Sequence, residues 1–526
     1  MNKDFILTGL ASVVIVLFLA WLWGPAIHLL WIIVPLIVLG VRDSLQTEHT
    51  LLRNFPVIGR GRWYMETLRP FMRQYFVESD THAEPVRRQY RILIYNRSQK
   101  VQDTIPFGSK VDMYAVGYEW IPHSIFALDA HEIDPQIRIN VGGPDCRKPY
   151  YSSILNISGM SYGAISPNAV KALNQGARLG GFAHNTGEGS ITPYHLEGGG
   201  DLIWQIGTGY FGCRAENGQF DPDKFREKSL LDKVKMIEIK LSQGAKPGHG
   251  GLLPASKNNA EIADIRGVAP HTTVHSPSMH STFDSPLELM QFIKQLRELA
   301  EGKPIGFKLC IGKRTEFLAL CKAMIETGIK PDFITIDGGE GGTGAAPLEY
   351  CDSIGMPLRE ALAFAADCLT GFNLKKDIKV IASGKVFNAA HVVKNLSLGA
   401  DICHSARGMM FALGCVQALQ CNKNTCPTGI ATQDPHLYRA LDVANKKERI
   451  KNFHDETLKN VVEILSAIGI RHTAELNRVN VYRRVSGNEV KRFDEIYPYV
   501  KEGELLTPPY PPRYEPEILQ ARAERF

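Results

Sequence analysis

Uncharged residues dominate the start of this chain. From Phe5 to Val41 there is no Asp, Glu, Lys or Arg, and His28 is the only titratable side chain. One membrane-spanning helix needs about 20 apolar residues, so the run is long enough for two short spans. Gly24-Pro25, near its middle, is typical of a turn. The sequence therefore predicts a transmembrane helical hairpin over 1–42, with spans at 5–23 and 25–41.

Two alternatives to the hairpin are a single tilted span and a cleaved signal peptide. The apolar part of a signal peptide is only about 7–15 residues long, much shorter than this run. Lys3 precedes the run and Arg42, Arg53, Arg60 and Arg62 follow it, so the positive-inside rule places both ends in the cytoplasm. We expect a cell-membrane protein with two spans, in contact with membrane lipid, and with the rest of the chain in the cytoplasm.

The composition beyond the run is that of a folded, reducing-compartment protein. The ten cysteines are too sparse for a disulfide scaffold. The net charge of +5 is spread along the chain, which argues against a nucleic-acid partner.

From about residue 150, short apolar runs alternate with amphipathic stretches of helix length. This alternation predicts a parallel sheet. The number of units favours a closed (β/α)8 barrel of the TIM type, which takes about 250 residues, over an open doubly wound sheet. The expected strands are Ser153–Ile157, Leu202–Ile206, Met236–Ile239, Ile305–Leu309, Phe333–Ile336, Ile378–Ile381 and Ile402–His404; the expected helices include Pro167–Leu179, Glu316–Glu326, Leu358–Leu369 and Ala389–Leu396.

The barrel is predicted to span 149–470. Residues 43–148 are interpreted as a connecting region of strands and loops. Residues 471–526 form a charged, then Pro-rich tail that we expect to wrap the surface without regular structure.

Two strand ends are followed by a small residue, a glycine and a cation, in Ser383-Gly384-Lys385 and Ser405-Ala406-Arg407-Gly408. Barrel enzymes often hold phosphate after their last two strands, where glycine lets backbone N–H groups approach the oxygens. The pattern predicts a phosphorylated ligand; ordinary turn chemistry is the alternative. Gly339–Gly344 matches G-x-G-x-x-G, but Pro347 interrupts any following helix, so we interpret it as a barrel loop against a flat ligand.

Three cysteines cluster late in the chain. Cys415, Cys421 and Cys426 read C-x5-C-x4-C, with Pro427 directly after. Such spacing suits a metal ion or an iron–sulfur cluster. The alternative is three unrelated buried thiols, which is how we interpret most of the other, scattered cysteines.

At this point the chain resembles the FMN-binding synthase domain of glutamate synthase. Five motifs agree in order and spacing over about 150–440: Gly159–Ser166, Asn185–Gly189, Gln243–Gly251, Asp337–Ala345 and Gly414–Gly429. The chain also resembles stand-alone, membrane-tethered members of that family. The resemblance implies FMN at the barrel mouth and a [3Fe–4S] cluster on Cys415, Cys421 and Cys426. It also implies reductive amination of 2-oxoglutarate, through 2-iminoglutarate, to L-glutamate, an oxidoreductase reaction of the CH–NH2 class.

The resemblance also assigns residues. Gln243, Lys246 and Arg266 would hold the dicarboxylate, Glu188 could move a proton, and Lys308 would stabilise the reduced flavin. The residues expected to contact FMN are Ser161, Gly163, Gly338, Gly339, Gly341, Gly342, Ser383, Gly384, Lys385, Arg407 and Gly408.

Some positions depart from the family pattern. Leu252 stands where glutamate synthases carry glutamine, and Gly339-Glu340 replaces a His-Asp pair. We expect no glutaminase and no NAD(P) module, so ammonia or an amine and a separate electron donor (ferredoxin, quinol or an NAD(P)H subunit) would be needed. Two further hypotheses are a related amino-acid or 2-oxo-acid oxidoreductase, such as an N-alkylglutamate synthase, and a membrane electron-transfer subunit without its own substrate. An IMP-dehydrogenase-like barrel fits the clustered cysteines poorly.

Overall fold

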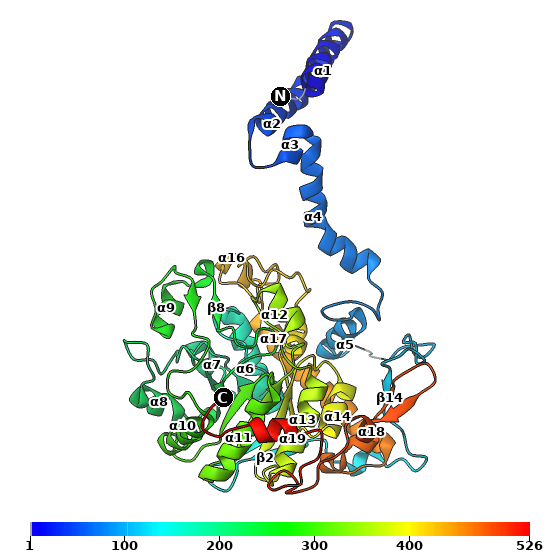
Figure 1. Cartoon of the computed structure of the whole chain (residues 1–526). Coiled ribbons are helices and arrows are strands. Elements are labelled where there is room, and N and C mark those ends of the chain that lie inside the picture. The colour runs from blue at the N-terminus through cyan, green and yellow to red at the C-terminus, as the bar shows by residue number, and fades with distance from the viewer. Residues whose placement is uncertain (1–2, 102–103) are drawn as a thin grey trace. The chain divides into compact units, whose positions relative to one another are not determined.

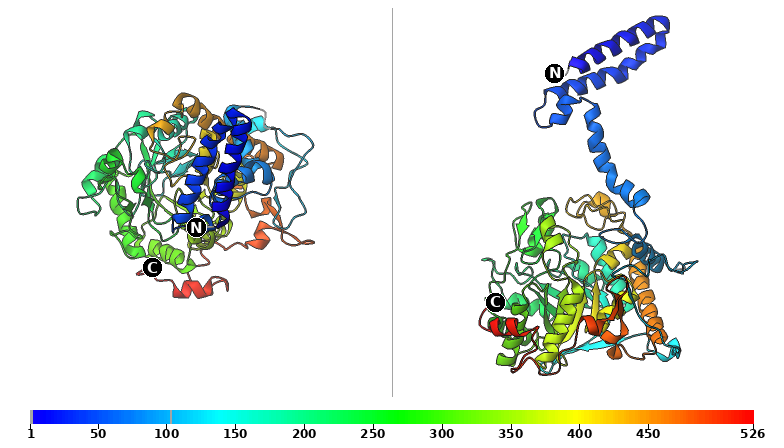
Figure 2. Two further views of the ribbon diagram at one scale, coloured as in Figure 1. Left: turned by 90° about the horizontal axis from the view of Figure 1, so that it is seen from above. Right: turned by 45° about the vertical axis from the view of Figure 1, so that its right-hand side comes forward.

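The computed structural model describes residues 3–101 and 104–526, which divide into two compact units, Met1–His82 and Ala83–Phe526 (Figure 1). The first unit begins with α1 (Lys3–Leu22), followed by the 3-10 turn η1 (Gly24–Leu29) and α2 (Leu30–Leu45). The two helices run side by side as a hairpin (Figure 2). Gly40 lies against the ring of Phe5. The predicted helical hairpin is confirmed, and within the described residues both arms are long and apolar enough to cross a membrane.

The rest of the first unit is helical. It contains α3 (Thr50–Asn54), η2 (Ile58–Arg60), α4 (Gly61–Met72) and the π-helical turn η3 (Arg73–Val77). The prediction of strands and loops for this part of 43–148 is therefore wrong. The apolar residues of α4 recur every three or four positions, which is the period of a helix and not of a strand.

The second unit is built on a closed barrel of eight strands. Its strands are β4 (Leu155–Ile157), β5 (His184–Asn185), β6 (Leu202–Ile206), β7 (Val234–Lys240), β10 (Ile305–Leu309), β11 (Phe333–Asp337), β12 (Lys379–Ser383) and β13 (Ile402–Ser405). Each pairs in parallel with its neighbours, and β13 closes onto β4. The predicted barrel is confirmed, although β5 was not among the expected strands.

Helices cover the outside of the barrel (Figure 1). They include α6 (Pro167–Gly180), α8 (Pro222–Ser229), α10 (Pro286–Leu299), α11 (Arg314–Thr327), α13 (Leu358–Gly371), α14 (Ala389–Ser397) and α15 (Arg407–Leu413). Ser166 caps α6, accepting a hydrogen bond from the Ala169 N–H at 3.2 Å. The hairpin of β2 (Arg138–Val141) and β3 (Tyr150–Ser153) precedes β4, and Val141 joins Met236, Phe333 and Ile402 in one buried apolar cluster.

A segment before the barrel packs over its outer helices. In α5 (Arg88–Gln99), Ile94 is fully buried and Tyr90 stacks on Phe387 with ring centroids 5.8 Å apart. The side-chain amide of Asn452, in α17 (Val443–Ile468), donates to the Ser98 carbonyl at 3.1 Å. Residues 83–99 are thus part of the second unit's core.

The tail after residue 471 is more regular than expected. It contains β14 (Tyr482–Arg484), β15 (Val490–Arg492), α18 (Phe493–Ile496) and α19 (Glu515–Gln520). β14 pairs antiparallel with β15 and with β1 (Glu119–Trp120). The prediction failed because these strands are only two or three residues long, too short to show an alternating pattern.

Candidate active site

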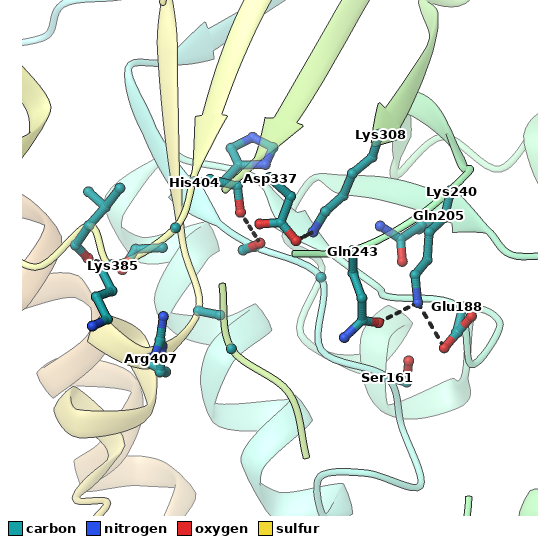
Figure 3. A pocket seen from close by; sticks show the side chains of 18 of the residues that line it. Ser161, Glu188, Gln205, Lys240, Gln243, Lys308, Asp337, Lys385, His404 and Arg407 are labelled. Atoms are coloured by element: carbon teal, nitrogen blue, oxygen red, sulfur yellow. Dashed lines mark hydrogen bonds and ion pairs between the residues drawn. The ribbon is translucent and has the colours of Figure 1, made fainter. Parts of the chain in front are cut away.

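A pocket opens at the carboxyl ends of the barrel strands. The space between its walls is about 590 Å³, a volume that includes the part open to solvent. Its walls are strongly polar (Figure 3). The lining residues are Ser158, Gly159, Ser161, Glu188, Gln205, Lys240, Gln243, Lys308, Asp337, Gly342, Ser383, Gly384, Lys385, Val386, Phe387, His404, Ser405, Ala406 and Arg407.

Lys308 and Asp337 form a buried ion pair at the centre of the pocket. They lie on the neighbouring strands β10 and β11, with Lys308 Nζ 3.3 Å from Asp337 Oδ2 (Figure 3). Burial opposes the charge on Lys308, but the carboxylates of Asp337 and Glu238 outweigh it and raise the pKa of Lys308 above its ordinary value. Lys308 is therefore a fixed positive charge in the pocket.

Glu188, Lys240 and Gln243 form a second group on one side of the pocket (Figure 3). Lys240 Nζ lies 3.0 Å from Glu188 Oε1 and donates to Gln243 Oε1 at 2.7 Å. Burial alone would raise the pKa of Glu188, but Lys240, with Lys246 and Arg266 nearby, lowers it below its ordinary value. Glu188 is thus held ionised beside an ammonium group.

A buried carboxyl group lies inside the barrel beneath these residues. Glu238, on β7, is 0% exposed. Its Oε1 accepts a hydrogen bond from the Thr335 hydroxyl at 2.6 Å, and its Oε2 accepts from the amides of Gln205 at 2.6 Å and Asn185 at 2.8 Å. A buried polar group is stable when its hydrogen bonds are made, and this network fixes the floor of the pocket.

Small residues and cations line the opposite side, after β12 and β13 (Figure 3). Gly384 has φ +137°, a conformation that L side chains rarely adopt, and the Ser383 hydroxyl lies 3.3 Å from that of Ser158. Lys385 pairs with Glu84 at 2.9 Å, and Arg407 Nη2 donates to the Glu340 carbonyl at 2.5 Å. Glycine beside two cations can receive an anionic group such as phosphate.

The two other predicted substrate residues lie outside the pocket lining. Lys246 Nζ donates to the Ala345 carbonyl at 2.9 Å, and burial, followed by the charge of Lys240, lowers its pKa to about 8. Arg266 ends α9 (Ala260–Arg266), donates to the Tyr162 carbonyl at 2.8 Å and lies over the Phe211 ring. Burial lowers the pKa of Arg266 to about 10. Both cations are close enough to Glu188 to influence its pKa.

Several predicted cofactor glycines do not line the pocket either. Gly338 donates its N–H to the Ser383 carbonyl at 2.9 Å, and Gly339 donates to the Met356 carbonyl at 2.8 Å. Gly163 has φ +100°. Gly341 donates its N–H to the Gly338 carbonyl at 2.8 Å, and Gly408 packs beside the Ser405 hydroxyl. These five shape the loops behind the lining; Ser161, Gly342, Ser383, Gly384, Lys385 and Arg407 face the pocket itself.

The three clustered cysteines lie in one winding loop. Gly414, Gln417, Leu419, Asn424 and Gly429 all have positive φ there. Burial, together with the neighbouring thiols of Cys421 and Cys426, raises the pKa of Cys415 to about 12. Among residues 3–101 and 104–526, no three His, Cys, Asp or Glu side chains form a group that could hold a single metal ion.

Groups around the cysteine loop nevertheless stabilise negative charge on its thiols. Burial opposes ionisation of Cys426, but the Thr428 hydroxyl at 3.3 Å and the backbone N–H groups of Ala431, Thr428 and Ile430 lower its pKa below the ordinary value. The ammonium group of Lys257 interacts electrostatically with Cys421 and Cys426 and donates to the carbonyls of Ala164 at 2.9 Å and Ala431 at 2.8 Å. The thiols of Cys415, Cys421 and Cys426 lie close enough to influence one another's pKa.

The polar pocket residues that sequence reasoning missed include Gln205, Lys240, Asp337 and His404. Lys240, Asp337 and His404 lie at or near the ends of predicted strands, which is where barrel enzymes place functional side chains. Their position at the strand ends was therefore a usable signal. Gln205 lies within β6, and nothing in its sequence context separates it from an ordinary strand residue.

Comparison with known proteins places the chain in a family. Residues 129–471 match the family model described as the conserved region in glutamate synthase. The glutamate synthase large subunit-like protein YerD of Bacillus subtilis is 36% identical over 515 residues, which cover 89% of this chain and 97% of that protein. An archaeal-type glutamate synthase [NADPH] of Thermotoga neapolitana is 33% identical over 340 residues, 64% of this chain and 61% of the relative.

The archaeal glutamate synthase [NADPH] of Methanocaldococcus jannaschii is 34% identical over 321 residues, 61% of this chain and 60% of the relative, so the chain matches about three fifths of these two enzymes. Among solved structures, a mutant flavocytochrome b2 with pyruvate bound has a TM-score of 0.43 at 15% identity, covering 80% of this chain and 85% of that one. This likeness is too low to support a conclusion. The family model and the long match to the Bacillus protein show that the chain belongs to the glutamate synthase family.

Proposed function

We propose that the protein is an FMN- and iron–sulfur-dependent oxidoreductase that converts 2-oxoglutarate and ammonia, through 2-iminoglutarate, to L-glutamate. Ammonia and electrons come from outside the chain, the electrons from a ferredoxin, a quinol or a separate NAD(P)H subunit. The α1–α2 hairpin anchors the protein in the cell membrane by two spans, with the second unit in the cytoplasm.

One observation carries this proposal: two different groups of side chains lie on opposite sides of the pocket, with the cation Lys308 between them (Figure 3). Lys385 and Arg407, with Gly384, lie at one side and suit the phosphate of FMN. Glu188, Lys240 and Gln243 lie at the other and suit a small polar substrate. Lys308 lies between them, where a flavin ring would join the two.

When bound, FMN supplies the hydride transfer that no amino-acid side chain can perform. The protein's own groups hold and orient the reactants. Lys308, kept protonated by Asp337, would stabilise the negative charge of a reduced flavin ring. Lys246 and Arg266 lie outside the pocket lining and would add positive charge that attracts the two carboxylates.

Glu188 would stabilise a proton on the imine nitrogen, and Lys240 would donate a proton to the product amine. Because Glu188 is held ionised, its carboxylate can stabilise a protonated imine, which is the form that accepts hydride most readily. The Lys240 ammonium, 3.0 Å away, can return a proton to the amine that forms. Lys240 was not predicted from the sequence; its 3.0 Å contact with Glu188 supports this role.

Cys415, Cys421 and Cys426 would hold a [3Fe–4S] cluster, which stores and passes on single electrons. The bent loop, the lowered pKa of Cys426 and the adjacent Lys257 favour thiolates at this place. Through Lys257, the loop is hydrogen-bonded to Ala164, three residues from Ser161 in the pocket wall.

A second candidate function is reductive coupling of 2-oxoglutarate with an alkylamine to give an N-alkylglutamate. Leu252 favours it, because an apolar side chain replaces glutamine there and directly follows Gly251, which lies beside Glu188. The alkyl group of methylamine or ethylamine could pack against this apolar side chain, whereas ammonia has no alkyl group to do so.

The test is reoxidation of the reduced flavin. Full-length protein is purified in detergent without oxygen, its absorbance and EPR spectra are recorded, and it is reduced and mixed with 2-oxoglutarate and ammonium. We expect a flavin spectrum, an oxidised [3Fe–4S] signal, and reoxidation with formation of L-glutamate. The variant Cys415→Ser, Cys421→Ser, Cys426→Ser should keep the flavin and lose the EPR signal. Cys146→Ser, Cys351→Ser serves as the matched control and should keep both.

The outcomes separate the hypotheses. Reoxidation by 2-oxoglutarate with methylamine but not with ammonium supports the N-alkylglutamate function. Electron exchange with a donor protein and no turnover of any 2-oxo acid supports an electron-transfer subunit. Protein without flavin or iron would show that only the fold is shared, and the proposal would be abandoned.

A further inference from the structure

The helical stretch of α4 and η3, residues 61–77, exposes a continuous apolar face. Among its apolar side chains, Tyr64 is 66% exposed, Leu68 48%, Phe71 43% and Tyr75 55%. No residue of α4 or η3 is buried in the part of the chain that the structure describes. A soluble helix normally buries such a face, and a contiguous exposed one indicates a binding surface.

The face is regular along the helix. Tyr64, Leu68, Phe71 and Tyr75 follow one another at intervals of four, three and four residues, and Met65 and Met72 lie along the same side. At 3.6 residues per turn Tyr64, Leu68 and Phe71 of α4 form one stripe, and Tyr75 follows in the π-helical turn η3. The stripe is therefore a property of the sequence and does not depend on where the second unit lies.

Arginines form a second line on the polar side of the helix. Arg62, Arg69 and Arg73 are separated by seven and four residues, which places them about 100–140° around the helix from Leu68. A helix with an aromatic and aliphatic face flanked by arginines has the composition of a peptide that lies in a membrane interface. The flank complements the negative headgroups of an anionic lipid surface.

The start of this helix is fixed close to the end of the hairpin. The Asp43 side chain at the end of α2 accepts hydrogen bonds from Arg60 Nη2 at 2.5 Å, Arg60 Nε at 3.0 Å and the Val57 N–H at 3.1 Å. Arg60 immediately precedes α4. In Figure 2, right, the helix then runs across the direction of α1 and α2 instead of extending it.

We propose that residues 61–77 form an interfacial helix whose apolar stripe lies on the anionic cytoplasmic surface of the membrane that α1 and α2 enter. A helix joined to the end of a spanning hairpin and running across it lies in the membrane plane. Its stripe then faces the acyl chains while Arg62, Arg69 and Arg73 reach the headgroups. The inference rests on membrane insertion of the hairpin and is independent of the redox reaction.

The test uses full-length protein in nanodiscs that contain phosphatidylcholine alone or mixed with phosphatidylglycerol. The photoreactive residue p-benzoylphenylalanine replaces Leu68, on the stripe, or Glu66, on the opposite side of the same helix. On illumination, mass spectrometry should find several-fold more lipid adduct at position 68 than at 66. Equal adducts at both positions, or adducts at 68 mainly to protein, would overturn the proposal.

Lipid charge gives a second readout. Hydrogen exchange of the amides of 64–76 should slow when phosphatidylglycerol is added, and the variant Arg62→Gln, Arg69→Gln, Arg73→Gln should lose that slowing. A matched control, Lys313→Gln, Lys423→Gln, Arg525→Gln, removes three cations from the second unit and should keep it. Exchange that does not respond to lipid charge in the parent protein would refute the role of the arginines.

Discussion

Replacement of Glu238 tests whether the polar network inside the barrel stabilises the second unit. Glu238→Ala removes the acceptor for three buried donors, the amides of Asn185 and Gln205 and the hydroxyl of Thr335. The hydroxyl can turn toward another acceptor, but the two amides cannot. An unsatisfied buried donor costs about 1–3 kcal/mol, so the two amides alone should destabilise the unit by about 2–6 kcal/mol.

Glu238→Gln should cost far less, although it also removes the charge. The Gln Oε1 can accept from both amides, and its new NH2 group can donate to the Thr335 hydroxyl, which accepts as well as donates. Both variants act at the same buried position and remove the same charge. The difference between them therefore reports the lost hydrogen bonds together with the space that the shorter alanine side chain leaves.

The assay is thermal unfolding of the full chain in detergent, followed by near-UV circular dichroism. At about 2.1 cal/mol/K per residue, a unit the size of Ala83–Phe526 has an unfolding entropy near 0.9 kcal/mol/K, so 2–6 kcal/mol corresponds to a Tm lower by about 2–6 °C. Glu238→Gln should stay within about 1 °C of the parent on the same scale. Equal Tm values for the parent and Glu238→Ala would refute the reasoning.

Three further predictions concern the pocket and the cysteine loop. Lys246 is charged below its pKa of about 8, so the affinity for a 2-oxo dicarboxylate should fall as pH rises through about 8. Flavin absorbance titration measures this affinity. The variant Lys246→Met should bind the dicarboxylate weakly at every pH. Lys257→Met removes a positive charge beside Cys421 and Cys426, so the reduction potential of the cluster, measured by EPR titration, should become more negative; an unchanged potential would contradict that role. Asp337→Asn should lower the pKa of Lys308, and the spectrum of the bound flavin should then acquire a pH dependence that the parent lacks over the same range.

Elements with a strong apolar signal were predicted well. Leu202–Ile206 and Ile305–Leu309 have the predicted bounds because each is a fully buried strand between turns. β5 was missed because it consists of only His184 and Asn185, whose side chains are polar. Its place in the barrel is set by its neighbours β4 and β6, a tertiary effect that no local pattern contains.

The sequence predicted which residues line the pocket better than it predicted which of them form ion pairs. Glu188, Gln243, Lys308 and Arg407 line one pocket, as expected from motifs far apart in the sequence. The partner of Glu188, Lys240, is a single charge at a strand end and has no motif of its own. Which cation lies 3.0 Å from a given carboxylate depends on barrel register, and only the folded structure gives that.

The contact between α5 and the cysteine loop determines where the chain can be cut. The Tyr95 hydroxyl donates to the Cys415 carbonyl at 2.5 Å, and Ile94 is buried beside the same loop and α17. A water-soluble fragment that starts near residue 149, at the predicted edge of the barrel, would lose this cover and expose apolar surface next to the thiols. A fragment that starts at Ala83 lacks only the first unit and keeps α5 packed on the cysteine loop. It is therefore the shortest fragment that we would choose for crystallisation.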